Sequence, residues 1–447
     1  MNRKLLIIFF LTLGFLVRTL FVKEGLNTDI TVFAEWGEGF WERGAKNFYS
    51  KEGWYYTFPA YPPPSNLIFA FLSYLNEHRY ILAQIHNTVK VIPADFIIFF
   101  GKTVPLDPLN QNYGYYLLLK LLPILSDLGI SLLVYKIIFD ITKHKVKSLL
   151  GFLLYLFNPV TVFLSGVWGQ TDSFVSLFGF LAFVLIYYKK IYLSLPFFFL
   201  SLYLKPAWAI FIPIYLWILY LSKPKISHIL TGGFLTLMIY LVTTTPFSNG
   251  NLIDFTKTMV FGYVSPFSKG TAKASISAFN FYTIFFKIDR DLATKTIMGI
   301  PLNHIGIIIY TLINFFTFSY IKKEKNKLLA IVLGIFSVGL GSYLFLTNML
   351  ERYFFSAFAP LVILGATNSK FLKSLLIVNL ILFANLIWAF YRRSSNEIDH
   401  PFTNYNFLLI RVLSLFLVIV YLQTLKKFGV LSLKVSKTPF HIFRGRI

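Results

Sequence analysis

Long apolar runs recur along this sequence, and they constrain its fold more than any motif does. Several reach about 18 or more residues, enough for a helix to cross a hydrocarbon core, whereas a membrane β-strand needs only about 9–11. Composition agrees, since 56% of the 447 residues are hydrophobic and 14% are charged. The mean hydropathy is +0.66. We therefore predict an all-α, polytopic integral membrane protein that forms a single domain over residues 1–447.

The apolar runs predict about twelve transmembrane helices. They are placed at 5–22, 113–138, 149–166, 174–188, 191–204, 207–221, 229–242, 305–320, 328–346, 353–364, 372–390 and 407–422. No small-residue cleavage site follows the first run, so we interpret it as an uncleaved anchor. Two long extracytoplasmic segments remain, at 23–112 and 246–300. Short apolar stretches at 67–75 and 91–100 are expected to form interfacial helices in the first segment, and the second is interpreted as a substrate lid.

The net charge of +23 follows the predicted topology. If Arg3 and Lys4 are cytoplasmic, every short connection on that side is rich in Lys or Arg, as the positive-inside rule requires. Of the 19 acidic residues, only Asp140 and Glu324 fall on that side. We therefore expect cytoplasmic termini, a multi-pass protein of the plasma membrane, and no nucleic-acid partner.

The polar motifs gather at the opposite, extracytoplasmic ends of the spans. These motifs are Asp29, Tyr61 to Pro64, Trp168 to Asp172, Lys205-Pro206 and Glu351-Arg352. The sequence has no cysteine and no phosphate-binding loop, dinucleotide fingerprint or metal-binding helix motif, and its seven histidines lack metal-ligand spacing. We expect no metal and no cofactor, and we expect a donor substrate to arrive through the membrane.

The chain resembles the GT-C superfamily of membrane glycosyltransferases, which use polyprenyl-phosphate sugars. Within that superfamily it most resembles the glucosyltransferases that complete the dolichol-linked oligosaccharide and bacterial mannosyltransferase-like membrane proteins. The matching stretches follow the family's order: Thr28-Asp29-Ile30 with Trp36, Tyr61-Pro62-Pro63, Leu122 to Gly129, Asn158-Pro159, Trp168 to Asp172, Lys205-Pro206 with Pro213, and Met349 to Tyr353. Two positions depart from the family pattern. Ala60 replaces an acid before Tyr-Pro-Pro and Leu350 replaces a histidine, which puts the substrate in doubt.

This resemblance implies an inverting enzyme that moves a hexose, mannose or glucose, from a polyprenyl-phosphate donor. The acceptor is a lipid-linked glycan, a glycolipid or a protein on the extracytoplasmic face. Asp29 matches the position of the general base. One carboxylate suffices, because a glycosyl phosphate has a leaving group that needs no protonation. Lys205 and Arg352 are expected to bind the donor phosphate. The substrate-binding candidates are Trp36, Tyr61, Gln170, Asp172 and Glu351.

Each of these residues also has a structural interpretation. Asp29 fits a solvated loop, Tyr61 a polyproline turn, and Trp168 an interfacial aromatic belt. Lys205 fits a side chain that snorkels from a helix end, and Arg352 fits a structural ion pair with Glu351.

Asp127 lies deep in a predicted span, and we expect it to pair with Lys120, about two turns away on the same helix face. At the level of function, two alternatives remain. One is a flippase or transporter of lipid-linked sugars, although no half-to-half repeat is evident. The other is a glycan polymerase or ligase whose catalytic loop is 246–300.

Overall fold

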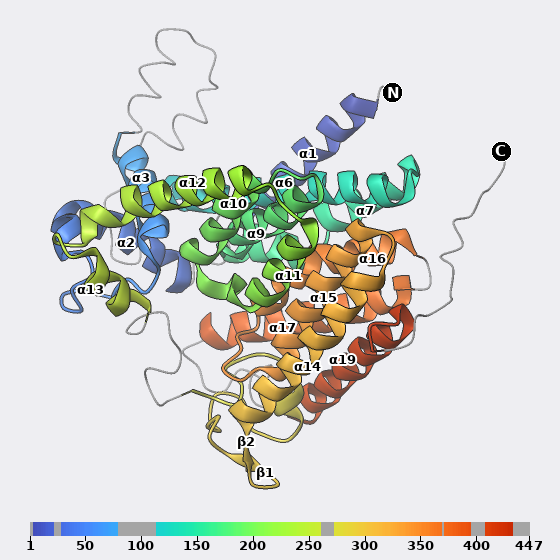
Figure 1. The fold of residues 1–447 in the computed structure, drawn as a ribbon. Coiled ribbons are helices and arrows are strands. Elements are labelled where there is room, and N and C mark those ends of the chain that lie inside the picture. Colours follow the sequence, from blue (N-terminus) through green and yellow to red (C-terminus); the bar gives the residue numbers. More distant parts are fainter. Residues whose placement is uncertain are drawn as a thin grey trace.

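The computed structural model describes residues 3–21, 28–78, 113–260, 272–368, 371–394 and 407–431, and it is almost entirely helical (Figure 1). The longer helices are α1 (Arg3–Thr19), α2 (Thr28–Asn47), α3 (Pro63–Glu77), α6 (Tyr113–Thr142), α7 (Lys145–Leu156), α9 (Asp172–Tyr187), α10 (Ile191–Leu204), α11 (Ile212–Ser222), α12 (Ile226–Thr244), α14 (Leu302–Lys323), α15 (Lys327–Phe345), α16 (Phe358–Thr367), α17 (Leu372–Ser394) and α19 (Phe407–Phe428). Short helices connect them: α8 (Pro159–Val162), the π-helix η1 (Phe163–Trp168), α13 (Leu252–Lys257), and the 3-10 helices η2 (Pro206–Phe211), η3 (Thr245–Phe247), η6 (Phe281–Ile284) and η7 (Tyr353–Ala357).

The prediction of an all-α protein with several helices apolar enough to span a membrane is confirmed. Within the described ranges, six helices are long and apolar enough to cross a bilayer, and a seventh span results if α7 and the bent segment after it count as one. Helices α9 and α10 are apolar but have only 16 and 14 residues. At 1.5 Å per residue a 16-residue helix covers about 24 Å, less than the roughly 30 Å of a hydrocarbon core. The count of about twelve spans therefore stays a prediction.

Helices α15 and α12 differ in how much of their surface the rest of the protein covers. Every residue of α15 from Leu328 to Phe345 is buried, and this helix lies at the centre of the bundle (Figure 1). Helix α12 is similarly apolar, but only 6% of its most apolar window is buried. A helix that is apolar all round and has no protein neighbours on most of its surface suits contact with hydrocarbon. We interpret α12 as a lipid-facing helix.

The first long segment between predicted spans, 23–112, contains more structure in its described part than the sequence predicted. Its described part, 28–78, folds into α2 and α3, which pack together with α13 beside them at one end of the molecule (Figure 1). An aromatic core joins the two helices, and it includes Phe33, Trp36, Phe48 and Phe69. The helix expected at 67–75 is present as α3, whereas the stretch 91–100 lies outside the described residues.

The Tyr61 to Pro64 motif forms the start of α3. Pro62 is the N-cap residue, and Pro63 and Pro64 occupy the first helical positions, where a missing backbone N–H costs no hydrogen bond. The next residue, Ser65, donates from Oγ to the carbonyl of Leu204 at 2.6 Å. This contact joins the start of α3 to the end of α10.

A second break lies at Asn158-Pro159. The Asn158 side chain accepts a hydrogen bond from the Val160 backbone N–H (2.9 Å), so it caps α8, and Pro159 starts that helix. Helix α7 and the segment from Pro159 to Trp168 meet at a bend of 40°. The segment ends as the π-helix η1, and Gly169 follows it with φ 75°. The turn places Trp168 and Gln170 at the end of this bent segment.

The second long segment is partly docked onto the bundle. It contains η3, α13 and η6, and a two-residue hairpin of β1 (Thr296–Ile297) and β2 (Ile300–Pro301) with Ile297 opposite Ile300. Backbone N–H groups of Ile276 and Ser277 donate to the carbonyl of Met349 at 3.1 and 3.3 Å. The part after residue 272 is therefore fixed beside Glu351 and Arg352.

Asp127 pairs with a different cation from the one that the sequence predicted. Its carboxylate lies 3.6 Å from the Arg18 guanidinium and accepts a hydrogen bond from Tyr155. Arg18 also donates to Ser165 and Thr161, both at 3.0 Å. Lys120 instead donates to backbone carbonyls. The expected Asp127 to Lys120 pair is wrong because a cation on α1, a separate helix, fills the position beside the carboxylate.

Candidate functional site

Asp29 lies in the first turn of α2, where two side chains from the turn at the end of η1, residues 168–170 (the η1 turn), hold its carboxylate. Trp168 donates from Nε1 to Oδ2 at 3.0 Å, and Gln170 donates from Nε2 to the same oxygen at 2.7 Å. Trp168 and Gln170 are buried, whereas Asp29 is partly exposed. The helix N-terminus adds a favourable field for a negative charge. The Asp29 carboxylate is thus held in place at the edge of a buried site. Its two donors lie about 140 positions away in the sequence.

Asp172, two residues beyond Gln170, joins the two predicted phosphate-binding cations. Its Oδ2 lies 2.9 Å from Lys205 Nζ and 3.6 Å from Arg352 Nε. All three side chains are at least 90% buried. Lys205 comes from the extended residue between α10 and η2, and Arg352 precedes η7. One carboxylate therefore brings cations from two distant parts of the chain into one cluster.

Arg352 is held from its other side by the preceding residue. Its Nη1 donates to Glu351 Oε1 at 2.6 Å, and the other oxygen of the fully buried Glu351 accepts a hydrogen bond from Ser277 Oγ. The guanidinium also lies over the Trp168 ring, with 5.8 Å between Cζ and the ring centroid. Arg352 thus links the Asp172 pair to the side chain that holds Asp29.

Tyr61 and Trp36 form the apolar border of the cluster. Lys205 Nζ lies 5.7 Å from the centroid of the Tyr61 ring, a cation–π distance. The Trp36 ring packs edge-on against Tyr61 at 5.4 Å between centroids, and its Nε1 donates to the carbonyl of Thr57. Trp36 therefore supports Tyr61 from within the aromatic core.

These contacts bring all the predicted site residues into one connected cluster. Within it the electrostatics favour charged cations. Burial by itself lowers the pKa of Lys205 and of Arg352, but nearby anions outweigh it. Asp172 raises the pKa of Lys205, and Glu351, Asp29 and Asp172 raise that of Arg352 well above its usual range.

Two buried polar atoms in the cluster make no hydrogen bond to any other described residue. They are Oε1 of Gln170, an acceptor, and Nε of Arg352, a donor. Buried polar atoms of folded proteins usually have partners. A carboxylate beside one acceptor and one donor that lack hydrogen bonds suits a polar ligand that carries both hydroxyl and anionic groups.

Sequence reasoning missed Ser277. No motif surrounds it, and its role depends on the backbone pairing that places 276–277 against Met349. The only available signal was the segment's length and its position between two spans.

A second group of acidic residues lies on α2 and α3, outside this cluster. Burial, and then repulsion from Glu42, Glu77 and Glu35, raise the pKa of Glu38 to about 7. The part of the chain that the structure describes contains no group of three or more His, Cys, Asp or Glu side chains that could hold a metal ion.

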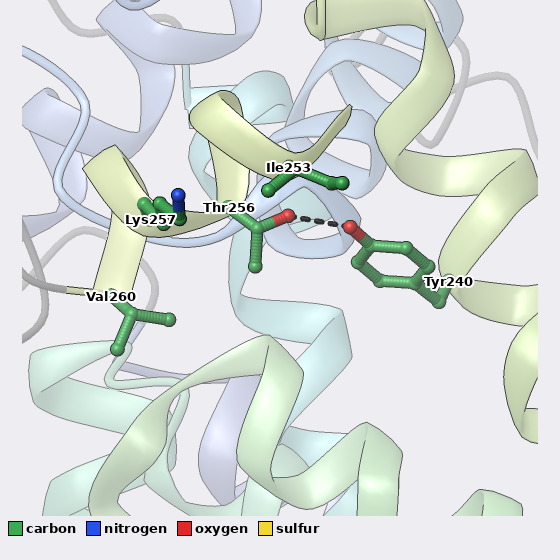
Figure 2. Close-up of a pocket in the computed structure, with 5 residues that line it drawn as sticks. All are labelled: Tyr240, Ile253, Thr256, Lys257 and Val260. Atoms are coloured by element: carbon green, nitrogen blue, oxygen red, sulfur yellow. Dashed lines mark hydrogen bonds between the residues drawn. The ribbon is translucent and has the colours of Figure 1, made fainter. Parts of the chain in front are cut away.

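A groove of about 290 Å³ lies between α12 and α13, lined by Tyr240, Ile253, Thr256, Lys257 and Val260 (Figure 2). The hydroxyl groups of Tyr240 and Thr256 are hydrogen-bonded across it. Its lining shares no residue with the cluster around Asp29, so the groove is not part of the candidate site.

Comparison with known proteins adds no functional assignment. No family model matches the chain, and no curated protein matches it. The similarity to GT-C glycosyltransferases therefore stays a prediction from the motifs.

Proposed function

We propose that this protein is an inverting membrane glycosyltransferase that moves a hexose, mannose or glucose, from a polyprenyl-phosphate donor. The acceptor is a lipid-linked glycan, a glycolipid or a protein. The observation that carries the proposal is the cluster itself, in which Asp29, held by Trp168 and Gln170, is connected to two buried cations. A base and a cationic pocket for an anionic leaving group are the two elements that this chemistry requires.

In the proposed reaction Asp29 accepts the proton of the acceptor hydroxyl. The electron pair of the deprotonated hydroxyl oxygen forms a bond to the anomeric carbon, and the bond from that carbon to the phosphate oxygen breaks on the opposite face. Its electron pair leaves with the polyprenyl phosphate, whose additional negative charge Lys205 and Arg352 stabilise. One carboxylate suffices because this leaving group needs no protonation.

Asp172 and Glu351 support this assignment as holders of the cations. A buried cation without a partner is unstable, so these pairs keep Lys205 and Arg352 charged before a donor arrives. The Arg352 Nε–H, which has no hydrogen-bond partner among the described residues, is the donor proposed for a phosphate oxygen. Gln170 Oε1 is proposed to accept a hydrogen bond from a sugar hydroxyl.

The proposal places both termini in the cytoplasm and the cluster at the extracytoplasmic face of a plasma membrane. It requires no resident cofactor. The Lys- and Arg-rich connections between spans support this orientation.

Translocation of a lipid-linked sugar is the second candidate, because buried charges also occur deeper in the bundle. Arg18, Lys120 and Asp127 are all fully buried. A substrate path requires cationic groups at several depths. Their protein partners, including the pair between Arg18 and Asp127, favour a structural role instead.

A transfer assay with purified protein separates the two functions. Wild type is incubated with radiolabelled polyprenyl-phosphate mannose or glucose and with membrane lipids, and the anomeric configuration of the product is determined. The proposal expects labelled product with inverted configuration. Product that retains the donor's configuration would contradict the single-displacement mechanism. If neither donor gives product and labelled donor crosses the bilayer of proteoliposomes, translocation replaces the proposal.

A further inference from the structure

Lys120 lies in α6, and its ammonium group is fully buried. Its Nζ donates to the carbonyl of Val167 at 2.8 Å and to the carbonyl of Phe21 at 3.2 Å. Val167 is the second-last residue of η1, and Phe21 lies two residues beyond the end of α1. The last carbonyls of a helix lack partners within it and carry partial negative charge, which a buried ammonium neutralises. Lys120 therefore caps η1 from a neighbouring helix and ties it to the end of α1.

The two donors that hold Asp29 are Trp168, the last residue of η1, and Gln170, which lies two residues beyond it. Trp168 follows Val167 directly, and the backbone N–H of Gln170 returns to the carbonyl of Leu164 at 3.0 Å. The position of the Val167 peptide therefore controls where the Trp168 indole and the Gln170 amide point.

Gly169 shows how closely this turn is packed. Its φ of 75° is unfavourable for other residues. A Cβ at this position would lie 2.8 Å from Cδ1 of Ile30 and 3.0 Å from Cγ of Lys120. Ile30 follows Asp29 in α2. Gly169 is thus packed between the alkyl chain of Lys120 and the start of α2. Displacement of Lys120 would therefore alter how the η1 turn packs against the start of α2, where Asp29 lies.

We infer that Lys120 is a positioning residue, which holds the η1 turn so that Trp168 and Gln170 keep the Asp29 carboxylate in its reactive orientation. This inference rests on the proposed function for its kinetic consequences, but its structural core does not. Lys120 acts through the two donors and belongs to neither the base nor the phosphate-binding pair.

The kinetic test compares Lys120→Met with Lys120→Arg and with Lys136→Met. Lys136 lies on the same helix, where its exposed side chain pairs with Asp140, and it serves as the matched control. Lys120→Met removes the charged hydrogen bond that holds Val167, and a loss of this size predicts that kcat falls about 10- to 100-fold. KM for the donor should stay unchanged. The acidic limb of the pH–rate profile should move to higher pH, because hydrogen bonds to a carboxylate favour its ionised form. Lys120→Arg, which keeps a charged donor, should recover part of the loss.

A loss of kcat with an unmoved pH profile and no recovery in Lys120→Arg would overturn the inference. So would an equal loss in Lys136→Met. If Lys120→Met does not fold, Lys120→Gln takes its place. Its neutral amide reaches one bond less far than the ammonium, so the same changes are expected in smaller measure.

A thermal unfolding cycle tests the coupling without any transfer activity. The Tm values of Lys120→Met, Asp29→Asn and the double variant are compared with wild type in detergent. If Lys120 holds the donors against Asp29, the loss of Tm in the double variant should be smaller than the sum of the single losses. Additive losses would overturn the inference even if the enzyme is active. Absence of transfer by wild type together with non-additive losses would refute the proposed function and leave the positioning role in place.

Discussion

Asp172 is the shared anion of the cluster, and the Asp172→Asn variant shows how strongly the structure depends on it. Asn keeps the shape of the side chain but leaves Lys205 buried against a neutral amide and Arg352 with Glu351. Removal of one partner of a buried pair costs about 3–5 kcal/mol, and an amide that still accepts a hydrogen bond recovers about 1 kcal/mol. We therefore expect the free energy of unfolding to fall by about 2–4 kcal/mol.

The measurement is equilibrium unfolding by a denaturing detergent in mixed micelles, followed by circular dichroism. Asp254→Asn is the control, because its pair with Lys257 spans 4.0 Å and both side chains are about two-thirds exposed. That change should cost less than about 1 kcal/mol. Addition of Lys205→Met to Asp172→Asn should restore much of the lost stability, since the uncompensated charge is then gone. Equal effects of Asp172→Asn and Asp254→Asn would refute the reasoning.

Three further changes test separate parts of the structure. The pKa of Glu38 is raised to about 7 from an unfolded value of 4.5, so the folded state holds its proton longer and stability falls as pH rises between these values. Glu38→Gln should flatten the dependence of Tm on pH over that window, and an unchanged slope would contradict the assignment. Arg18→Met leaves the buried Asp127 without its cation and should lower the free energy of unfolding by about 3–5 kcal/mol. Addition of Asp127→Asn should restore most of this loss. A loss below about 1 kcal/mol in Arg18→Met would show that the pair does not anchor α1. Ser277→Ala removes a hydrogen bond to the carboxylate of Glu351, and KM for the donor should rise about tenfold in the transfer assay, whereas a normal KM would separate this contact from donor binding.

The sequence predicted the helices well because hydropathy depends on local composition. The run at 191–204 coincides with α10, and those at 328–346 and 372–390 lie within a few residues of α15 and α17. The number of spans, in contrast, stays a prediction. Apolar composition does not show whether a helix of 14 or 16 residues crosses a bilayer alone, bends, or completes a broken span.

The site was predicted as a set of residues, but its contacts were not. Motif order identified Asp29, Lys205 and Arg352, and the structure brings them together. The Trp168 and Gln170 hydrogen bonds to Asp29 depend on a π-helical turn, which has no signal in the sequence. The partner of Asp127 was predicted wrongly because spacing along one helix cannot reveal a cation on another helix. Ser277 was missed because its position depends on tertiary pairing.

The proposed function rests above all on Asp29, and the measurement that addresses it is sugar transfer by Asp29→Asn beside wild type. Radiolabelled polyprenyl-phosphate mannose and glucose are the donors, and size-exclusion chromatography in detergent verifies that each variant is folded. Asn keeps one acceptor oxygen for the N–H groups of Trp168 and Gln170 but cannot accept the proton. The account predicts that kcat falls about 100-fold or more, while the folded peak is unchanged. Equal transfer by wild type and a folded Asp29→Asn would contradict the account.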